Sequence, residues 1–424
     1  MKKIFAIAVA FMMFGSLAQA RKVSGSVVSG EEKLSGVIVT DGKNFTVTKK
    51  NGKFSFDIKD DAEFVYIVTP SGYVADWSTG VPAFYQEAAG RSKFVFELQK
   101  TEASGDYSIL AIADPQTRNE KQFAKFAGKP MADICETAST MTGAAVGLVL
   151  GDICWDSLEL LEKYRKEIVR AGIPFYPVVG NHDHEMELQG DLQTTATYRR
   201  LMGPENYAFC LGNDVVIVLD NIIYDTQKKY EEGYASHVIS WVKGLEALLP
   251  DGADLYVAQH SPVKYWDNGR KIIGASDLID ILRGRKVSFI SGHTHMNNNL
   301  EYEKNINEHN VAAICGSWWD TDHCTDGTPG GYKVFTMKDG RLSWYYKSVG
   351  HDKDHQVELY KPGQAPLHPN SAVVNIWDWD PSWKVEWFED GKPMGPLAPV
   401  KEYSPVYVRE INEAFAGKEI PGYK

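Results

Sequence analysis

The sequence of 424 residues lacks several features that would mark particular classes of protein. It has no run of lysine and arginine, and its 45 basic against 56 acidic residues give a net charge of −11. Nucleic-acid binders and proteins that bind anionic membranes present basic patches, so we expect neither kind of partner. No apolar run approaches the roughly 20 residues that cross a bilayer, so we expect no membrane span.

Cysteine is scarce, with five residues, and a chain of this length needs no disulfide scaffold. The odd number leaves at least one thiol unpaired. Cys315 and Cys324 could bridge a short loop, which spacing alone does not decide. We expect Cys135, Cys154 and Cys210 to be buried free thiols, because they stand in apolar surroundings. Aromatic residues, in contrast, are plentiful and exclude global disorder.

The first twenty residues have the order of parts typical of a signal peptide. Met1-Lys2-Lys3 is a basic start, the apolar run 4–14 follows, and Ala18-Gln19-Ala20 gives the small-residue pattern of a cleavage site. We therefore predict that residues 1–20 are a signal peptide. The mature protein would be exported to the periplasm or the outside of the cell.

Residues 21–100 contain short β-rich runs that Ser-Gly, Asp-Gly and Asn-Gly dipeptides separate. Several strands at such spacing predict a small β-sandwich. The stretches 37–42 and 51–56 resemble the transthyretin-like or immunoglobulin-like modules found at the front of secreted enzymes. We interpret this module as a structural spacer.

Residues 104–350 alternate between apolar runs and helical patterns, which predicts one α/β domain. Further β runs close it at 311–314, 332–337 and 342–346. We interpret 351–370 as a linker and the whole of 351–424 as a C-terminal β-rich module. Its tryptophans, at positions 377, 379, 383 and 387, could stack on a sugar or substrate, but their alternation favours core filling.

Five apolar runs of the middle domain end in side chains that can bind metals. In an open α/β sheet the carboxyl ends of strands converge on the ligand site, so these groups should meet. Such mixed nitrogen and oxygen ligands suit Mn, Fe or Zn, with Mg as an alternative, and we expect a dinuclear site. The five segments are Asp114-Pro115-Gln116, Gly151-Asp152, Gly180-Asn181-His182-Asp183-His184, Gln259-His260 and Gly292-His293-Thr294-His295.

The order of these segments resembles the calcineurin-like metallophosphoesterase superfamily. Its motifs are Asp-x-His, Gly-Asp, Gly-Asn-His-Asp/Glu, a lone His and Gly-His-x-His, and four of the five stand intact here. The resemblance covers roughly 104–350 and extends to a bacterial secreted branch with N-terminal and C-terminal β modules, through 316–319, 326–329 and 375–378. It implies an α/β (α+β) core of four layers, in which helices flank mixed β sheets.

The resemblance also implies a role for each matched residue. Asp152 would bridge two metals, and a metal-bridging hydroxide would attack phosphorus without a phosphoenzyme intermediate. His182 would face the leaving oxygen as general acid, so that His182 and Asp152 are the catalytic candidates. The first metal would be held by Asp114, Gln116, Asp152 and His295, and the second by Asp152, Asn181, His260 and His293.

Two positions depart from the superfamily pattern. Gln116 replaces the histidine of the first motif, and its weaker carbonyl donor would shift the first metal toward Mn or Mg. Trp155 stands where protein-phosphatase-like relatives have an aspartate that orients the catalytic histidine. Asp156, Asp183 and a backbone group are the candidates to orient His182 here.

These features together predict a metal-dependent phosphoric ester hydrolase, a monoesterase or diesterase, acting on a small phosphorylated substrate. Trp318 and Trp319 follow a β run and would line the substrate cleft, with a packed aromatic loop as the alternative. The alternative function is a binding protein with a weak or inactive phosphoesterase-like core. Gln116 and the missing aspartate at position 155 support that alternative.

Overall fold

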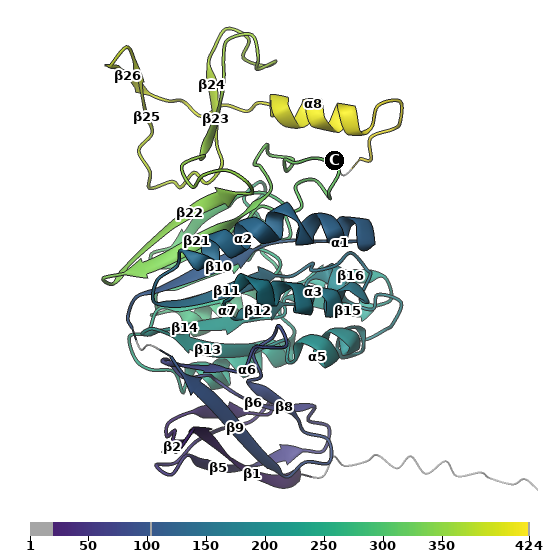
Figure 1. Cartoon of the computed structure of the whole chain (residues 1–424), viewed down its shortest axis with the longest axis vertical. Coiled ribbons are helices and arrows are strands. Elements are labelled where there is room, and N and C mark those ends of the chain that lie inside the picture. The colour runs from purple at the N-terminus through teal and green to yellow at the C-terminus, as the bar shows by residue number, and fades with distance from the viewer. Residues whose placement is uncertain (1–19, 102–103, 423–424) are drawn as a thin grey trace, which may run out of the picture.

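The computed structural model describes residues 20–101 and 104–422, so the predicted signal peptide lies outside the described residues except for Ala20. The chain forms three stacked parts, with the N-terminal module at one end, the C-terminal module at the other and a large core between them (Figure 1). Within the described ranges, no helix combines the length and apolarity needed to cross a membrane.

The N-terminal module consists of two sheets that share one apolar core, as the turn-rich sequence predicts. In the strand Lys93–Lys100 (β9), Phe94, Phe96 and Leu98 are buried and alternate with exposed residues. The first sheet runs β2-β1-β9-β7, with β5 also paired to β1. It contains β1 Ala20–Ser29, β2 Glu32–Lys33, β5 Lys53–Lys59, β7 Tyr73–Ala75 and β9. The second, β4-β3-β6-β8, contains β3 Ile38–Thr40, β4 Phe45–Val47, β6 Phe64–Ile67 and β8 Tyr85–Glu87.

The core contains two mixed sheets. The first has the order β12-β11-β10-β21-β22, in which β10, β11 and β12 are parallel and β21 and β22 antiparallel. Its strands are β10 Tyr107–Ile112, β11 Ala144–Leu150, β12 Phe175–Val178, β21 Gly331–Lys338 and β22 Arg341–Ser348. The second has the order β13-β14-β17-β18-β20-β19. Its strands are β13 Tyr207–Leu211, β14 Asp214–Val218, β17 Leu255–Ala258, β18 Val287–Ser291, β19 Asn298–Glu303 and β20 Ile306–Asn310.

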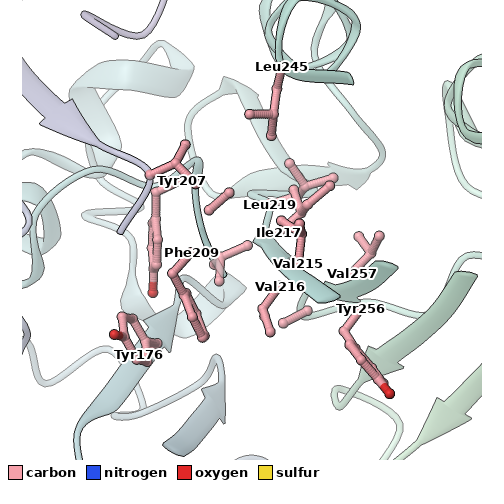
Figure 2. Close-up of a cluster of buried hydrophobic side chains, with 14 of the residues drawn as sticks. Tyr176, Tyr207, Phe209, Val215, Val216, Ile217, Leu219, Leu245, Tyr256 and Val257 are labelled. Atoms are coloured by element: carbon pink, nitrogen blue, oxygen red, sulfur yellow. The ribbon is translucent and has the colours of Figure 1, made fainter. Parts of the chain in front are cut away.

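Helices cover the outer faces of the two sheets, which confirms the expected four layers. In β10 all residues are buried, but Ile109 and Ala111 belong to the cluster between the sheets, whereas Leu110 and Ile112 pack under the helices. Between the sheets, Tyr176 stacks on Phe209 with ring centroids 3.8 Å apart (Figure 2). The helices on the first sheet are α1 Glu120–Ala127, α2 Lys129–Ser139 and α3 Leu160–Ile168 with its extension η1 Val169–Ala171, and those on the second are α6 Ser236–Glu246 and α7 Ala275–Leu282.

Shorter elements connect the sheets beside the strand ends. They are η2 Asn181–Asp183, α4 Asp191–Thr194, α5 Ala196–Met202 and the hairpin β15 Ile222–Thr226 with β16 Lys229–Glu232.

The strand predicted at 311–314 is wrong. The segment makes one isolated bridge, between Ala313 and Ala113. The Val311 amide donates to the Ser291 carbonyl at 2.7 Å, and the Ile314 amide donates to the Ala113 carbonyl at 2.9 Å. The segment therefore crosses from the end of β18 to the end of β10. Its apolar residues are buried, but they do not pair with a neighbouring strand as part of a sheet.

Two expectations for the C-terminal region are also wrong. The supposed linker contains the strand β23 Val357–Tyr360, which pairs with β24 Val373–Ile376. Trp377 is buried, but Trp379, Trp383 and Trp387 are 49%, 41% and 39% exposed. Of these three, only Trp387 lies in a strand, and that strand belongs to a two-stranded hairpin, which buries little on its own. The module also contains the hairpin β25 Glu386–Glu389 with β26 Lys392–Pro396, and the helix α8 Pro405–Ala414.

The C-terminal module joins the core through polar contacts. Lys333 of β21 and Asp378 are both fully buried, and the Lys333 ammonium lies 2.8 Å from the Asp378 carboxylate. Asn299 of β19 donates to the same carboxylate at 2.9 Å. On α8, Glu410 accepts hydrogen bonds from the amides of Asp322 and His323 at 3.1 and 3.2 Å.

All five cysteines are free thiols. Cys154 is buried as expected. Cys135 and Cys210 are free as expected but only half-buried, so the predicted burial is wrong for these two. Cys315 and Cys324 are both buried in one small apolar cluster.

Candidate metal centre

The five polar segments meet at the carboxyl ends of the core strands, and their backbone is strained there. Among the described residues, twelve non-glycine residues have a positive φ, and eight of them lie at this site. Each such conformation costs roughly 1–3 kcal/mol and persists only where the surroundings enforce it. The eight, with φ between 43° and 68°, are Asp114, Gln116, Asp152, Asp156, His293, His295, Trp318 and Trp319.

Glycine is required at two turns because the loops approach too closely for a side chain. A Cβ on Gly180 would lie 2.1 Å from the Asp152 backbone nitrogen. A Cβ on Gly151, which also has a φ of +83°, would lie 2.6 Å from the His260 ring. These two glycines therefore allow the loops after β11, β12 and β17 to come together.

Asp114, Gln116 and His295 form one half of the centre, and each has a buried polar atom without a hydrogen-bond partner. These atoms are Asp114 Oδ1, Gln116 Oε1 and His295 Nδ1. The Gln116 amide nitrogen donates to Asp152 Oδ2 at 3.0 Å, which places Gln116 beside the predicted bridging carboxylate. His295 Nε2 lies 3.5 Å from Asp114 Oδ1. Unsatisfied buried polar atoms are costly, so three on these neighbouring residues fit a ligand set that holds a cation.

Asp152, His260 and His293 form the other half, and their ligand atoms lie within 4.8 Å of one another. His260 Nδ1 donates to the Leu150 carbonyl at 2.7 Å, which directs Nε2 inward. There Nε2 lies 3.0 Å from Asn181 Oδ1, 3.0 Å from His293 Nδ1 and 3.3 Å from Asp152 Oδ1. Four groups with lone pairs thus face one point, and a divalent cation would satisfy all of them.

The electrostatics of this half also favour positive charge. Burial alone would lower the pKa of His260, but the Asp152 carboxylate outweighs it and raises the pKa to about 10. Burial alone would raise the pKa of Asp152, but His260, His182 and His293 hold it below its ordinary value. The residues therefore fit a metal centre by geometry and by charge.

His182 stands beside the centre, and Asp156 orients it. His182 Nδ1 donates to Asp156 Oδ1 at 2.7 Å, and the His182 amide donates to Asp152 Oδ1 at 2.9 Å. Asp183, the other carboxylate candidate, instead accepts hydrogen bonds from the amides of Gly180, Ile153 and Cys154 at 3.0 to 3.2 Å. The carboxylate that the superfamily pattern places at position 155 is thus supplied one residue later.

Three family models match the chain over almost its whole length. The model described as calcineurin-like phosphoesterase matches residues 107–297. Those described as the N terminal and the C terminal of calcineurin-like phosphoesterase match residues 21–108 and 308–421. The chain belongs to the calcineurin-like phosphoesterase family. Members of this family bind divalent metals, in agreement with the ligand set described above.

Several solved structures resemble this phosphoesterase. A dimetal phosphatase from Danio rerio gives a TM-score of 0.43 at 13% identity, over 58% of this chain and 97% of the other. A purple acid phosphatase from yellow lupin (Lupinus luteus) seeds gives a TM-score of 0.41 at 11% identity, over 76% of this chain and 68% of the other. A 5'-nucleotidase from Candida albicans gives a TM-score of 0.35 at 10% identity, over 59% of this chain and 54% of the other. A search of curated proteins found no match.

One residue of the phosphoesterase site, Glu232, carries no motif and is not predicted from the sequence. It lies on β16, and its Oε1 is 3.3 Å from His293 Nε2. Tyr265 and Arg270 donate to the same carboxylate at 2.9 and 2.7 Å. Burial acts to raise the pKa of Glu232, but His293, Tyr265 and Arg270 outweigh it and lower the pKa to about 2. The ionised Glu232 fixes the His293 ring with Nδ1 toward the centre.

The two tryptophans predicted to line the cleft of the phosphoesterase lie in different surroundings. The Trp318 ring packs on the His295 ring, with centroids 4.6 Å apart, and thus borders the centre. The Trp319 indole donates to the Pro115 carbonyl at 2.9 Å, and the Lys125 ammonium donates to the Trp319 carbonyl at 2.8 Å. Trp319 therefore holds the loop that carries Asp114 and Gln116, whereas contact of Trp318 with substrate stays a prediction.

Proposed function

We propose that the protein is a phosphoric ester hydrolase that acts on a small phosphorylated substrate through a dinuclear metal centre. The main support is that the seven predicted ligands lie together at one end of the two sheets. Three of them have a buried polar atom without a hydrogen-bond partner. Asp114, Gln116, Asp152 and His295 would hold one metal, and Asp152, Asn181, His260 and His293 the other. When bound, two divalent cations supply Lewis-acid activation of a water nucleophile and neutralise phosphoryl charge.

The side chains around the centre have separable tasks. His182 keeps its Nδ1 proton on Asp156, so Nε2 is the atom that can pass a proton to the leaving oxygen. Burial would lower the pKa of His182, but Asp152 and Asp156 outweigh it and raise the pKa. The Asp156 carboxylate in particular favours the protonated form of His182, as a general acid requires.

The test is turnover of 4-nitrophenyl phosphate and bis(4-nitrophenyl) phosphate by protein loaded with Mn, Fe, Zn or Mg. Metal content is measured on the same samples. We expect hydrolysis of at least one ester, and the ratio of the two rates gives the preference for monoesters or diesters. Absence of turnover with both sites filled would instead favour the binding protein with an inactive core.

We further propose that the mature enzyme is exported to the periplasm or the outside of the cell. The support is the signal-peptide pattern of residues 1–20. N-terminal sequencing of the protein from a periplasmic or culture-medium fraction should begin at Arg21. Recovery of an uncleaved chain from the cytosol alone would contradict export.

A further inference from the structure

We propose that Arg118 and Trp155 form a subsite for a second oxyanion, carried by the leaving group of the substrate. This inference rests on the proposed hydrolase function and narrows it. The preferred substrates would be phosphoric esters whose leaving group also bears a carboxylate or a phosphate-like group.

The two residues stand on neighbouring loops of the metal centre. Arg118 follows Gln116 by two positions, and Trp155 follows Asp152 by three. The Trp155 amide donates to the Thr117 carbonyl at 2.9 Å, and the Ser157 hydroxyl donates to the Arg118 carbonyl at 2.7 Å. The backbone of both residues is therefore fixed relative to the ligands.

The side chains form a short stack that leads to the predicted general acid. The guanidinium carbon of Arg118 lies 3.5 Å from the centroid of the Trp155 ring. The Trp155 ring centroid lies 4.7 Å from that of His182. Since His182 faces the leaving oxygen, Arg118 stands on the leaving-group side of the phosphoryl group, one aromatic ring beyond the proton donor.

The charge of Arg118 is not neutralised by the protein. Across residues 20–101 and 104–422 no carboxylate forms an ion pair with it, and its buried Nε has no hydrogen-bond partner. Other partly buried arginines are paired, for example Arg199 with Glu205 and Arg285 with Glu246. A half-buried cation without a counter-ion is costly, so an anionic ligand that pairs with the guanidinium gains affinity.

The chemistry of the guanidinium selects the ligand. Its planar fork donates two parallel hydrogen bonds to a carboxylate or phosphate, and the stack on Trp155 holds that fork in place before the ligand arrives. A neutral leaving group would leave the guanidinium without an anionic partner. We therefore expect preference for a leaving group with a second oxyanion.

The experiment compares phenyl phosphate with 4-carboxyphenyl and 4-phosphonophenyl phosphate on the metal-loaded full chain. We expect kcat/KM about tenfold higher for the anionic esters, the size of one charge-assisted hydrogen bond. The two anionic esters show whether a planar carboxylate or a tetrahedral oxyanion is preferred.

The variants test whether Arg118 causes this preference. In Arg118→Met the ratio of kcat/KM for an anionic ester to that for phenyl phosphate should fall to about one, and in Arg118→Lys it should fall partly. Arg341→Met, at an exposed position of β22, should keep the wild-type ratio.

A second measurement needs no turnover. Quenching of tryptophan fluorescence gives the dissociation constants of benzylphosphonate and 4-carboxybenzylphosphonate. Their ratio measures the same preference for a second oxyanion. Equal affinities in the wild type, or a ratio that survives in Arg118→Met, would overturn the subsite. If no ester is hydrolysed but the binding ratio depends on Arg118, the subsite stands and the hydrolase proposal fails.

Discussion

Replacing Asp156 by Asn tests how the protein prepares His182, its proposed proton donor. The change keeps the shape of the side chain but removes the charge that accepts a hydrogen bond from His182 at 2.7 Å. A charge-assisted hydrogen bond contributes roughly 1.5–3 kcal/mol. Because the Asp156 side chain is 36% exposed, solvent screening favours the lower end of that range. We expect kcat for phenyl phosphate to fall about tenfold.

Comparing esters with different leaving groups separates an effect of Asp156 on proton donation by His182 from a structural effect. 4-Nitrophenolate leaves readily without a proton, whereas phenolate needs one, so Asp156→Asn should affect phenyl phosphate far more than 4-nitrophenyl phosphate. Asp156 raises the pKa of His182, and the acid must be protonated. The fall of kcat at high pH should therefore move to lower pH in the variant. Glu159→Gln, at a nearby exposed position, is the control. Equal losses on both esters with an unmoved pH profile would refute the reasoning.

Three further variants test other parts of the site. Asp152→Ala should lose both metals, as measured by metal analysis after desalting, and a variant that keeps either metal would contradict the bridging role. Glu232→Gln should weaken binding of one metal about 10- to 100-fold in a titration, because the His293 ring loses its orienting partner, and an unchanged affinity would exclude that role. Glu410→Gln should raise KM more than it lowers kcat, because α8 supports the loop of Trp318. Glu413→Gln, on the exposed side of α8, should change neither, and equal effects of the two variants would argue against specific support.

The core, and the convergence of the proposed ligands, could be predicted because local sequence determines them. Buried strands such as β10 and β17 are continuous apolar runs, and the proposed metal ligands follow them directly. The convergence of those groups then follows from the topology of parallel strands. The segment 311–314 shows the limit of this reasoning, because an apolar run can be buried by crossing strand ends as well as by joining a sheet.

The supporting residues could be predicted only in part, because one comes from a distant segment without a motif and the other stood among several candidates. Glu232 reaches His293 from a hairpin 61 positions earlier in the chain. Asp156 is near its partner, but only the loop geometry, with its φ of +57°, shows that it replaces the usual residue. Trp383 and Trp387 alternate with charged residues as a buried strand face would, but both are partly exposed and only Trp387 lies in a strand.

The buried pair of Lys333 and Asp378 has a consequence for how the chain can be divided. A cut after residue 350 would look natural from the sequence, but it would leave the Lys333 ammonium inside the core without its counter-ion. Removing one partner of such a pair typically costs about 3–5 kcal/mol, a large part of the stability of an ordinary domain. The catalytic core and its C-terminal neighbour should therefore unfold in one transition.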